Sequence, residues 1–155
     1  TLNPSSAASD VYKRQYEIAL PSDYSGKQFI TYAGWASKFT KNIPLPMQRA
    51  TIEPYCEKNK IKYTSYEFEN DHCDWQPSLE YFIKEKPDGI VLCSMYAMTD
   101  NKERRNYILN LALDLGVELH FANESTSLKS KNDLEKLKTY LDFAVPKKNH
   151  YVWEK

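Results

Sequence analysis

Four short stretches of the chain have the apolar, β-branched and aromatic content that is typical of strands. Residues 88–94 contain an apolar run without alternation, which indicates a strand covered on both faces of a sheet. The other three stretches are residues 27–33, 61–68 and 117–122. Polar clusters, glycine or proline separate the four stretches, so we expect four distinct strands.

The segments between and after these strands have apolar residues at the spacing of amphipathic helices. Asp100 and Glu103 can form a capping box that opens a helix ending at Leu115, and Gly116 stands at its C-terminal cap. Three further helices are expected to begin near Pro46, Asp74 and Ser130. Pro54 lies inside the first of these, where it should kink or shorten the helix by removing a hydrogen bond.

Strands that alternate with helices in this way indicate a mostly parallel sheet with helices on both faces. We therefore expect a single three-layer α/β/α domain, with a sheet of four to five strands, over residues 27–145. Residues 1–26 are expected to lie outside the core, and residues 1–15 resemble a non-native linker tract, so they support no inference about targeting. Residues 146–155 are expected to form a flexible tail.

Composition narrows the classes of function. The 155 residues include 21 basic and 21 acidic side chains, so we expect no nucleic-acid partner. No apolar run approaches the length of a membrane span, so no membrane partner is expected. The three cysteines fit neither a zinc site nor a disulfide framework, which favours a reducing cytoplasm. Since a glycine-rich nucleotide loop is also missing, we expect no metal and no cofactor; a homo-oligomer is compatible with the sequence.

Ligands of open α/β sheets bind beyond the carboxyl ends of the strands, and this rule selects a set of polar residues. The candidates for substrate binding are Gln48, Arg49, Ser37, Glu67, Ser94, Tyr96 and Arg104. The two serines follow strands, as nucleophiles often do, but neither has the surrounding glycines of a nucleophile elbow. The favoured alternative for the serines is a hydroxyl that only caps a turn, and for Arg104 it is a solvated helix face.

The fourth strand carries the clearest anomaly in the polar pattern. Alternation places Glu118, His120 and Glu124 on one face, although a strand covered on both faces should be apolar. One interpretation makes these three residues catalytic, with His120 as general acid or base and Glu118 or Glu124 orienting it. The alternative is an edge strand whose outer face is partly solvated, so that Glu118 and His120 merely satisfy each other.

Several short motifs are spread over the foldable part of the chain. They are Pro46-x-Gln48, Tyr66-Glu67-Phe68, Asp88-Gly89-Ile90-Val91 followed by Ser94-Met95, Arg104-Arg105, and Gly116-x-Glu118-Leu119-His120-Phe121-Ala122-x-Glu124. Together they resemble the sporadic carbohydrate cluster protein family, small bacterial proteins encoded among genes for surface polysaccharide or lipopolysaccharide synthesis. Members often have Leu-Pro after the third strand, where this chain has Ala97-Met98-Thr99.

This resemblance implies a cytoplasmic protein of bacterial surface carbohydrate biosynthesis that acts on or binds a sugar or an activated sugar. A small-molecule sugar ligand is then the expected partner, and no particular reaction is implied. A non-catalytic binding or scaffold module of the same pathway is the alternative. Whether the chain is an enzyme is therefore open at this stage.

A looser resemblance links the chain to the serine recombinase (resolvase) catalytic domain. The shared features are the order of strands, Gln48 in the first helix, Glu124 after the fourth strand, and Ser37 near the place of the serine that attacks DNA. The recombinase motif Asp-Arg-x-x-Arg-Ser after the third strand is absent from this chain, so phosphodiester attack lacks its anion clamp. This resemblance implies a resolvase-like or Rossmann-like fold, and the corresponding function is a degenerate resolvase-like domain without recombinase activity.

Overall fold

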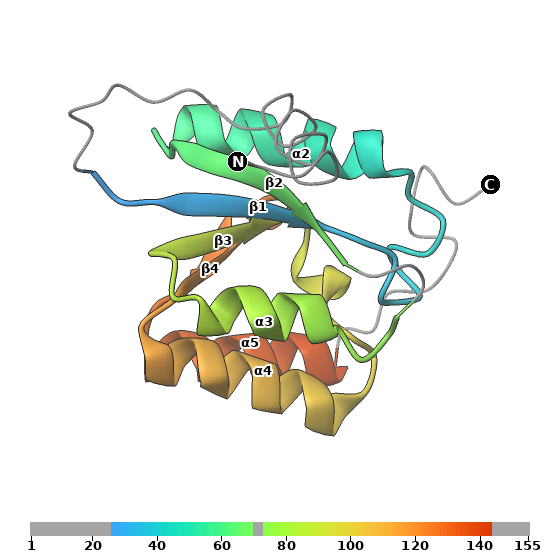
Figure 1. The fold of residues 1–155 in the computed structure, drawn as a ribbon. Helices are drawn as coiled ribbons and strands as arrows, with labels where there is room; N and C mark the ends of the chain where they lie inside the picture. Colours follow the sequence, from blue (N-terminus) through green and yellow to red (C-terminus); the bar gives the residue numbers. More distant parts are fainter. Residues whose placement is uncertain (1–25, 70–72, 144–155) are drawn as a thin grey trace, which may run out of the picture.

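Five strands form one sheet in the computed structural model, which describes residues 26–69 and 73–143 (Figure 1). The strands are β1 (Phe29–Ala33), β2 (Tyr63–Phe68), β3 (Gly89–Leu92), β4 (Glu118–Phe121) and β5 (Thr126–Leu128). They lie in the order β2-β1-β3-β4-β5. The pair of β4 and β5 is antiparallel and the other neighbouring pairs are parallel, which confirms the expected mostly parallel sheet.

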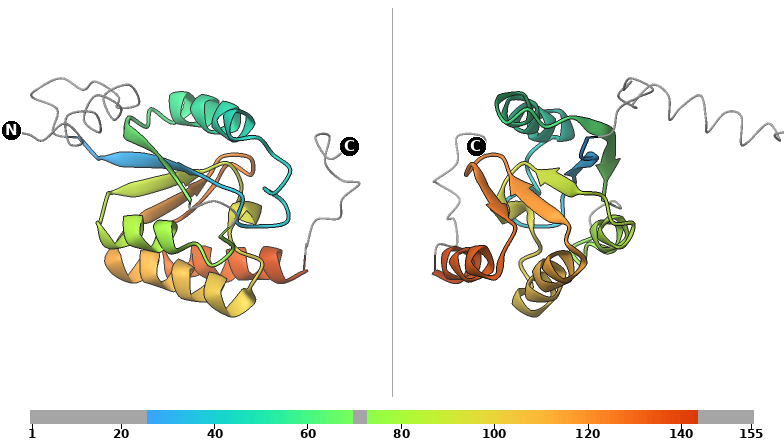
Figure 2. Two further views of the ribbon diagram at one scale, coloured as in Figure 1. Left: turned by 45° about the vertical axis from the view of Figure 1, so that its right-hand side comes forward. Right: turned by 90° about the vertical axis from the view of Figure 1, so that its left-hand side faces the viewer.

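Helices cover both faces of this sheet. Helix α2 (Leu45–Lys58) lies on one face, and α3 (Pro77–Lys84), α4 (Lys102–Leu115) and α5 (Lys131–Phe143) lie on the other (Figures 1 and 2). A short 3-10 helix, η1 (Met95–Ala97), follows β3. The expected three-layer α/β/α fold is therefore confirmed, whereas the expectations for residues 1–25 and 146–155 fall outside the described residues. Helix α2 continues through Pro54 to Lys58, so this proline does not end it.

Strand β3 is the buried centre of the fold. Ile90, Val91 and Leu92 have no exposed surface, as expected for a strand covered on both faces. On the α4 and α5 side, Leu119 and Phe121 of the neighbouring strand β4 are equally buried. The core therefore lies between the sheet and its two helical layers and fixes the orientation of β4.

The expected sheet of four to five strands has five, but the sequence did not locate β5, because a strand of three residues is too short to show alternation. Strand β5 pairs with β4 through Leu119 opposite Leu128 and His120 opposite Ser127. Strand β4 is thus an interior strand. The alternative interpretation, in which His120 lies on an edge strand, is wrong.

The capping of two helices differs from the sequence prediction. Asn101 rather than Asp100 caps α4, because its Oδ1 accepts a hydrogen bond from the Arg104 backbone N–H at 2.9 Å. The Asp100 carboxylate instead accepts from the Lys38 backbone N–H at 2.8 Å and so links the loop after β1 to the start of α4. Asp74, expected to cap α3, is replaced in that role by a more distant carboxylate.

That carboxylate belongs to Glu69, which directly follows β2 and is 8% exposed. It accepts hydrogen bonds from the backbone N–H groups of Ser78 at 3.0 Å and Leu79 at 3.1 Å, in the first turn of α3. It also accepts from the Tyr32 hydroxyl at 2.9 Å. Gly34 approaches so closely that a Cβ on it would lie 2.6 Å from the Glu69 Cβ, and only glycine avoids this contact.

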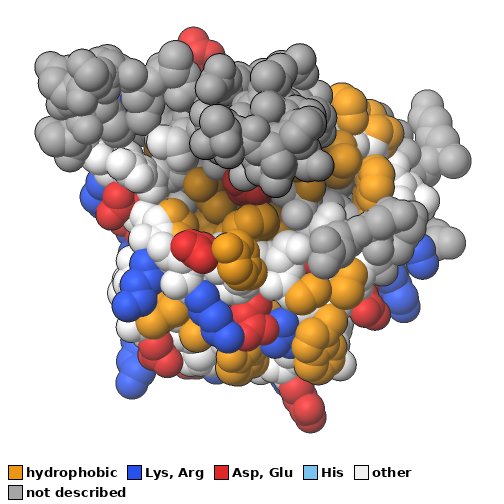
Figure 3. All heavy atoms as spheres, viewed as in Figure 1, with side chains coloured by type: hydrophobic (Ala, Val, Ile, Leu, Met, Phe, Trp, Pro, Cys, Tyr) orange, Lys and Arg blue, Asp and Glu red, His pale blue; other side chains and the backbone are white. Residues whose placement is uncertain are grey.

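The face seen in Figure 3 carries basic and acidic side chains interspersed over its lower part, where α3 and α4 lie. Arg104 and Lys84 both pair with Glu80 there, at 2.5 and 2.7 Å. Mixed charges on this face agree with the balanced composition of the chain. Among the described helices, none has the length and apolar content required to cross a membrane.

We predict that Gly34→Ala lowers the free energy of unfolding by about 1–3 kcal/mol, because the new Cβ overpacks against Glu69. Urea denaturation of wild type, Gly34→Ala, Glu69→Gly and the double variant completes a double-mutant cycle. Glu69→Gly removes the crowded Cβ, so the double variant should lose less stability than the sum of the single variants. Strictly additive losses would contradict the close approach.

Candidate functional site

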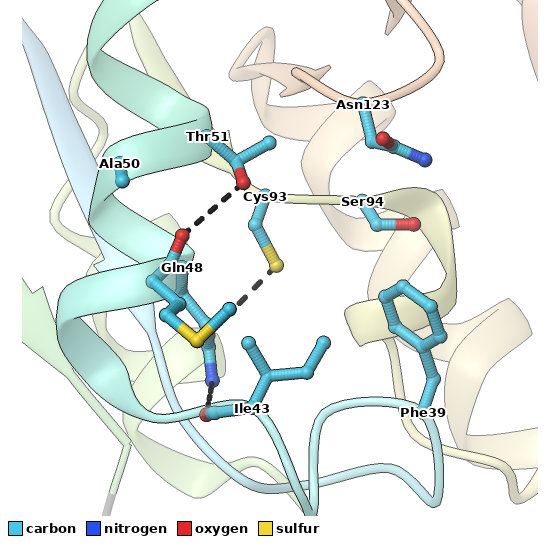
Figure 4. Close-up of a pocket in the computed structure, with 9 residues that line it drawn as sticks. Phe39, Ile43, Gln48, Ala50, Thr51, Cys93, Ser94 and Asn123 are labelled. Atoms are coloured by element: carbon cyan, nitrogen blue, oxygen red, sulfur yellow. Dashed lines mark hydrogen bonds between the residues drawn. The ribbon is translucent and has the colours of Figure 1, made fainter. Parts of the chain in front are cut away.

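Two hollows lie on the α2 side of the sheet, near opposite ends of α2. The first, which we call the carboxyl-edge pocket, has a volume of about 200 Å³ (Figure 4). Its lining residues are Phe39, Ile43, Met47, Gln48, Ala50, Thr51, Cys93, Ser94 and Asn123. The pocket lies where the sequence predicted the ligand site, beyond the carboxyl ends of the parallel strands, but its lining is mainly apolar.

The polar side chains at this pocket are bonded to the protein itself. The Gln48 amide accepts from the Gly34 N–H at 3.1 Å and donates to the carbonyls of Gly34 at 2.9 Å and Ile43 at 3.1 Å. Its side chain is buried, and Figure 4 shows the amide turned toward Ile43 rather than into open space. Burial raises the pKa of the neighbouring Cys93 thiol to about 12, with a further contribution from the charge of Glu124, so this thiol is unreactive.

Glu124 and Ser94 brace the turn between β3 and η1. The Glu124 carboxylate accepts hydrogen bonds from the Ser94 hydroxyl at 2.7 Å and from the Met95 backbone N–H at 2.7 Å. Asn123 donates to the same carboxylate at 3.0 Å, and the Tyr96 backbone N–H donates to the Ser94 hydroxyl at 3.1 Å. Glu124 is therefore engaged at the carboxyl edge and does not contact His120.

Ser37 is buried in the loop after β1. Its hydroxyl donates to the Tyr96 carbonyl at 2.7 Å and lies 2.9 Å from the Thr40 hydroxyl. Burial raises the pKa of the Tyr96 phenol, whose ring packs near Phe39 with the centroids 5.9 Å apart. Ser37, whose place resembles that of the recombinase nucleophile, thus has its hydroxyl bonded within the loop structure.

Three further candidates lie outside both hollows. The Arg49 guanidinium stacks on the Tyr66 ring of β2 at 4.1 Å, and Arg104 is held by Glu80. Glu67 lies on the outermost strand of the described sheet. The structure therefore does not gather the predicted substrate-binding residues into one site.

The second hollow, which we call the polar groove, has a volume of about 520 Å³ and lies at the C-terminal end of α2. It is lined by Lys27, Phe29, Tyr55, Asn59, Lys60, Ile61, Lys62, Glu118, His120, Ser125, Ser127 and Lys129. The connection between α2 and β2 forms one side, and the β4–β5 hairpin forms the other. Two of the three predicted catalytic residues, Glu118 and His120, therefore meet in this groove.

A chain of hydrogen bonds links these two residues to Tyr55 of α2. The Nε2 atom of His120 lies 2.8 Å from the Glu118 carboxylate, and its Nδ1 atom lies 2.7 Å from the Tyr55 hydroxyl. Because a carboxylate only accepts, Nε2 carries the proton and Nδ1 accepts from the phenol in the neutral ring. The His120 side chain is 7% exposed and both its nitrogens are engaged, so a ligand in the groove meets the half-buried Tyr55 first.

The environment determines which groups of this chain are charged at neutral pH. Burial lowers the pKa of His120 below its ordinary value of 6.5, and the hydrogen bond to Glu118 only partly offsets the effect. Burial acts to raise the pKa of the Glu118 carboxyl, but hydrogen bonds from His120 and Lys27 outweigh it, so this pKa lies below 4.5. Burial also raises the pKa of Tyr55 above 10.0. At pH 7 the imidazole and the phenol are therefore neutral and the carboxylate is charged.

Sequence reasoning missed Tyr55 and the lysines of the groove. Tyr55 follows Ile52 at helical spacing, so its pattern is that of a core residue. The four lysines come from three separate segments that only the fold brings together. Within the described part of the chain, no group of three histidine, cysteine, aspartate or glutamate side chains is arranged to hold a metal ion.

We predict that the His120 ring titrates below pH 6.5 in the folded protein, because burial disfavours the imidazolium. Protonation then favours the unfolded chain, so the free energy of unfolding should fall as the pH drops through 6.5 toward the folded pKa. NMR titration of the histidine rings measures the first effect, and denaturation between about pH 7 and 5 measures the second. The stability loss should shrink in His120→Gln; a His120 pKa above 6.5 would contradict the dominance of burial.

No protein-family model and no curated protein matches the chain. Solved structures are similar to it, and two of them are compared with it below. One is the N-terminal catalytic domain of TP901-1 integrase, with 13% identity and a TM-score of 0.57 over 76% of this chain and 96% of that one. The other is a resolvase family site-specific recombinase from Streptococcus pneumoniae, with 14% identity and a TM-score of 0.57 over 77% of this chain and 88% of that one. None of these comparisons supports the resemblance to the carbohydrate cluster family; what they show is that the chain has a resolvase-like fold.

Proposed function

We propose that the polar groove is the functional site and that it binds and acts on a sugar or an activated sugar. The observation that carries this proposal is the chain from Glu118 through His120 to Tyr55, which ends at the groove. Two of these three residues belong to the motif on which the carbohydrate resemblance is most specific. On this proposal the chain is a cytoplasmic protein of bacterial surface carbohydrate biosynthesis.

The chemistry we propose is proton transfer through the phenol. A hydroxyl of the sugar gives its proton to the Tyr55 oxygen while the Tyr55 proton moves to Nδ1 of His120. The ligand oxygen gains the negative charge, and the new imidazolium is stabilised by the Glu118 carboxylate at 2.8 Å. Reversal of the two transfers returns the proton to the product. The neutral imidazole at pH 7 supports this role, because only the neutral ring can accept.

A second candidate function is a resolvase-like domain without recombinase activity, and the fold favours it. The residues needed for recombination are not in place in the described part of the chain. Ser37 is buried. Arg104 and Arg105, at the start of α4, form ion pairs with Glu80 and Asp142 respectively. These contacts support a function other than attack on a phosphodiester.

We predict that Tyr55→Phe and His120→Gln each lower turnover of the sugar substrate about 100-fold or more, the range expected when an acid or base is lost. The assay follows product formation by mass spectrometry over a panel of sugar phosphates and nucleoside diphosphate sugars. Lys136→Ala, on α5 across the sheet, should keep the wild-type rate. Wild-type rates in Tyr55→Phe would remove the phenol from the mechanism, and binding without turnover would favour the scaffold alternative.

We also predict that a short DNA duplex at low salt shows no salt-dependent binding, because the chain has balanced charge. Fluorescence anisotropy with a labelled duplex provides the measurement. The wild type and the Ser37→Ala variant should give the same result. An association constant for the duplex whose logarithm falls linearly with the logarithm of the salt concentration would contradict the sugar proposal and favour a nucleic-acid ligand.

A further inference from the structure

We infer that the polar groove takes a phosphate-bearing ligand and that its lysines hold the phosphoryl group. This inference rests on the proposed function, because it names the class of ligand for the same groove. The charged lining residues are four lysines and one glutamate, beside a histidine. The groove therefore concentrates positive charge in a chain whose basic and acidic residues are equal in number.

Glu118 is the one carboxylate among the residues that line the groove. It lies 2.9 Å from the Lys27 Nζ and 3.9 Å from the Lys129 Nζ, and the charge of Asp88 also acts on Lys27. Lys60 adds positive charge from the opposite side, on the connection between α2 and β2. A phosphoryl group brings up to two negative charges and several acceptor oxygens, which match ammonium groups with three donors each.

The end of α2 sets the position of Lys60. Its φ is 55°, in the left-handed region where glycine is favoured, yet a charged side chain stands there. Ser125, on the facing hairpin of the groove, has a φ of 49°. Lys60 directly follows the C-cap of α2, where the Ile61 N–H donates to the Cys56 carbonyl at 2.8 Å, so its left-handed φ closes the helix and holds the lysine at the groove.

The arrangement divides the ligand between two sets of residues. The lysines anchor the phosphoryl group, and Tyr55, which lines the same groove, meets a hydroxyl of the sugar. A sugar phosphate and a nucleoside diphosphate sugar share this chemistry. The number of phosphoryl groups that the groove prefers is what separates these two sources.

Isothermal titration of the full chain at low ionic strength tests the inference with four probes: glucose, glucose 1-phosphate, inorganic pyrophosphate and uridine diphosphate. We expect the phosphorylated probes to bind, glucose not to bind, and the affinity to fall as salt is added. Tighter binding of glucose 1-phosphate than of the two diphosphates indicates a sugar phosphate, and the reverse order indicates a nucleoside diphosphate sugar.

Variants locate the binding. Lys60→Gly removes a charge and relaxes the backbone, so it should weaken binding about tenfold while the thermal midpoint stays equal or rises. Lys129→Ala should weaken binding similarly, since its ammonium lies near Glu118 in the groove. Lys136→Ala, which removes the same charge from α5, should leave the affinity unchanged.

The outcomes separate this inference from the function on which it rests. Unchanged phosphate affinity in the double variant of Lys60→Gly and Lys129→Ala overturns the inference, as does turnover of a neutral sugar without any phosphate binding. Phosphate binding that both substitutions weaken, without turnover of any sugar, supports the inference and overturns the catalytic proposal. Preferential binding of a DNA duplex that competes with pyrophosphate also overturns the inference.

Discussion

Buried backbone groups in the loops at the carboxyl edge need hydrogen-bond partners, and most of the fold depends on the side chains that supply them. Gln48 bonds both backbone groups of Gly34, in the way that a neighbouring strand would. On the other face, Gln76 bonds two residues of one loop: it accepts from the Thr99 N–H at 2.7 Å and donates to the Ala97 carbonyl at 3.2 Å. Glu69 accepts hydrogen bonds from the backbone N–H groups in the first turn of α3. These contacts fix the loops against one another and the helices against the sheet.

This requirement also explains where chemistry can occur. At the N-terminal end of α2, the polar side chains form hydrogen bonds with the backbone of the loops, and the lining of the pocket there is mainly apolar. At the C-terminal end of the same helix, Tyr55, His120 and Glu118 bond to one another, and lysines surround them. A buried histidine is tolerated in an interior strand because both of its nitrogens are satisfied. The hydrogen-bonded chain of the polar groove thus lies away from the edge where open sheets usually bind ligands.

The sequence predicts the layers of this fold well, because each long element has a periodicity that its burial preserves. It does not predict β5, whose three residues show no pattern, or the capping of α3 by Glu69, which comes from a separate strand. Polarity correctly marked Glu118 and His120 as unusual in β4. Polarity alone could not separate them from Glu124, since a carboxylate that braces a turn and one that orients an imidazole look alike in sequence. The sequence did not indicate Tyr55 as a site residue, because an aromatic residue on the buried face of a helix usually serves to pack the core.

The β4–β5 hairpin has a consequence for motion around the groove. Within the described sheet, β5 is an outer strand of three residues, and β4 is its only neighbour. Few ladder hydrogen bonds hold it, so its local opening costs less free energy than unfolding of the parallel strands. Leu128 is fully buried and anchors one end of the hairpin, while the turn that bears Ser125 lies at the other. Since Glu124 of that turn also bonds Ser94 and Met95, the wall of the groove opposite Tyr55 is held at both ends, and its weakest part is the short ladder between them.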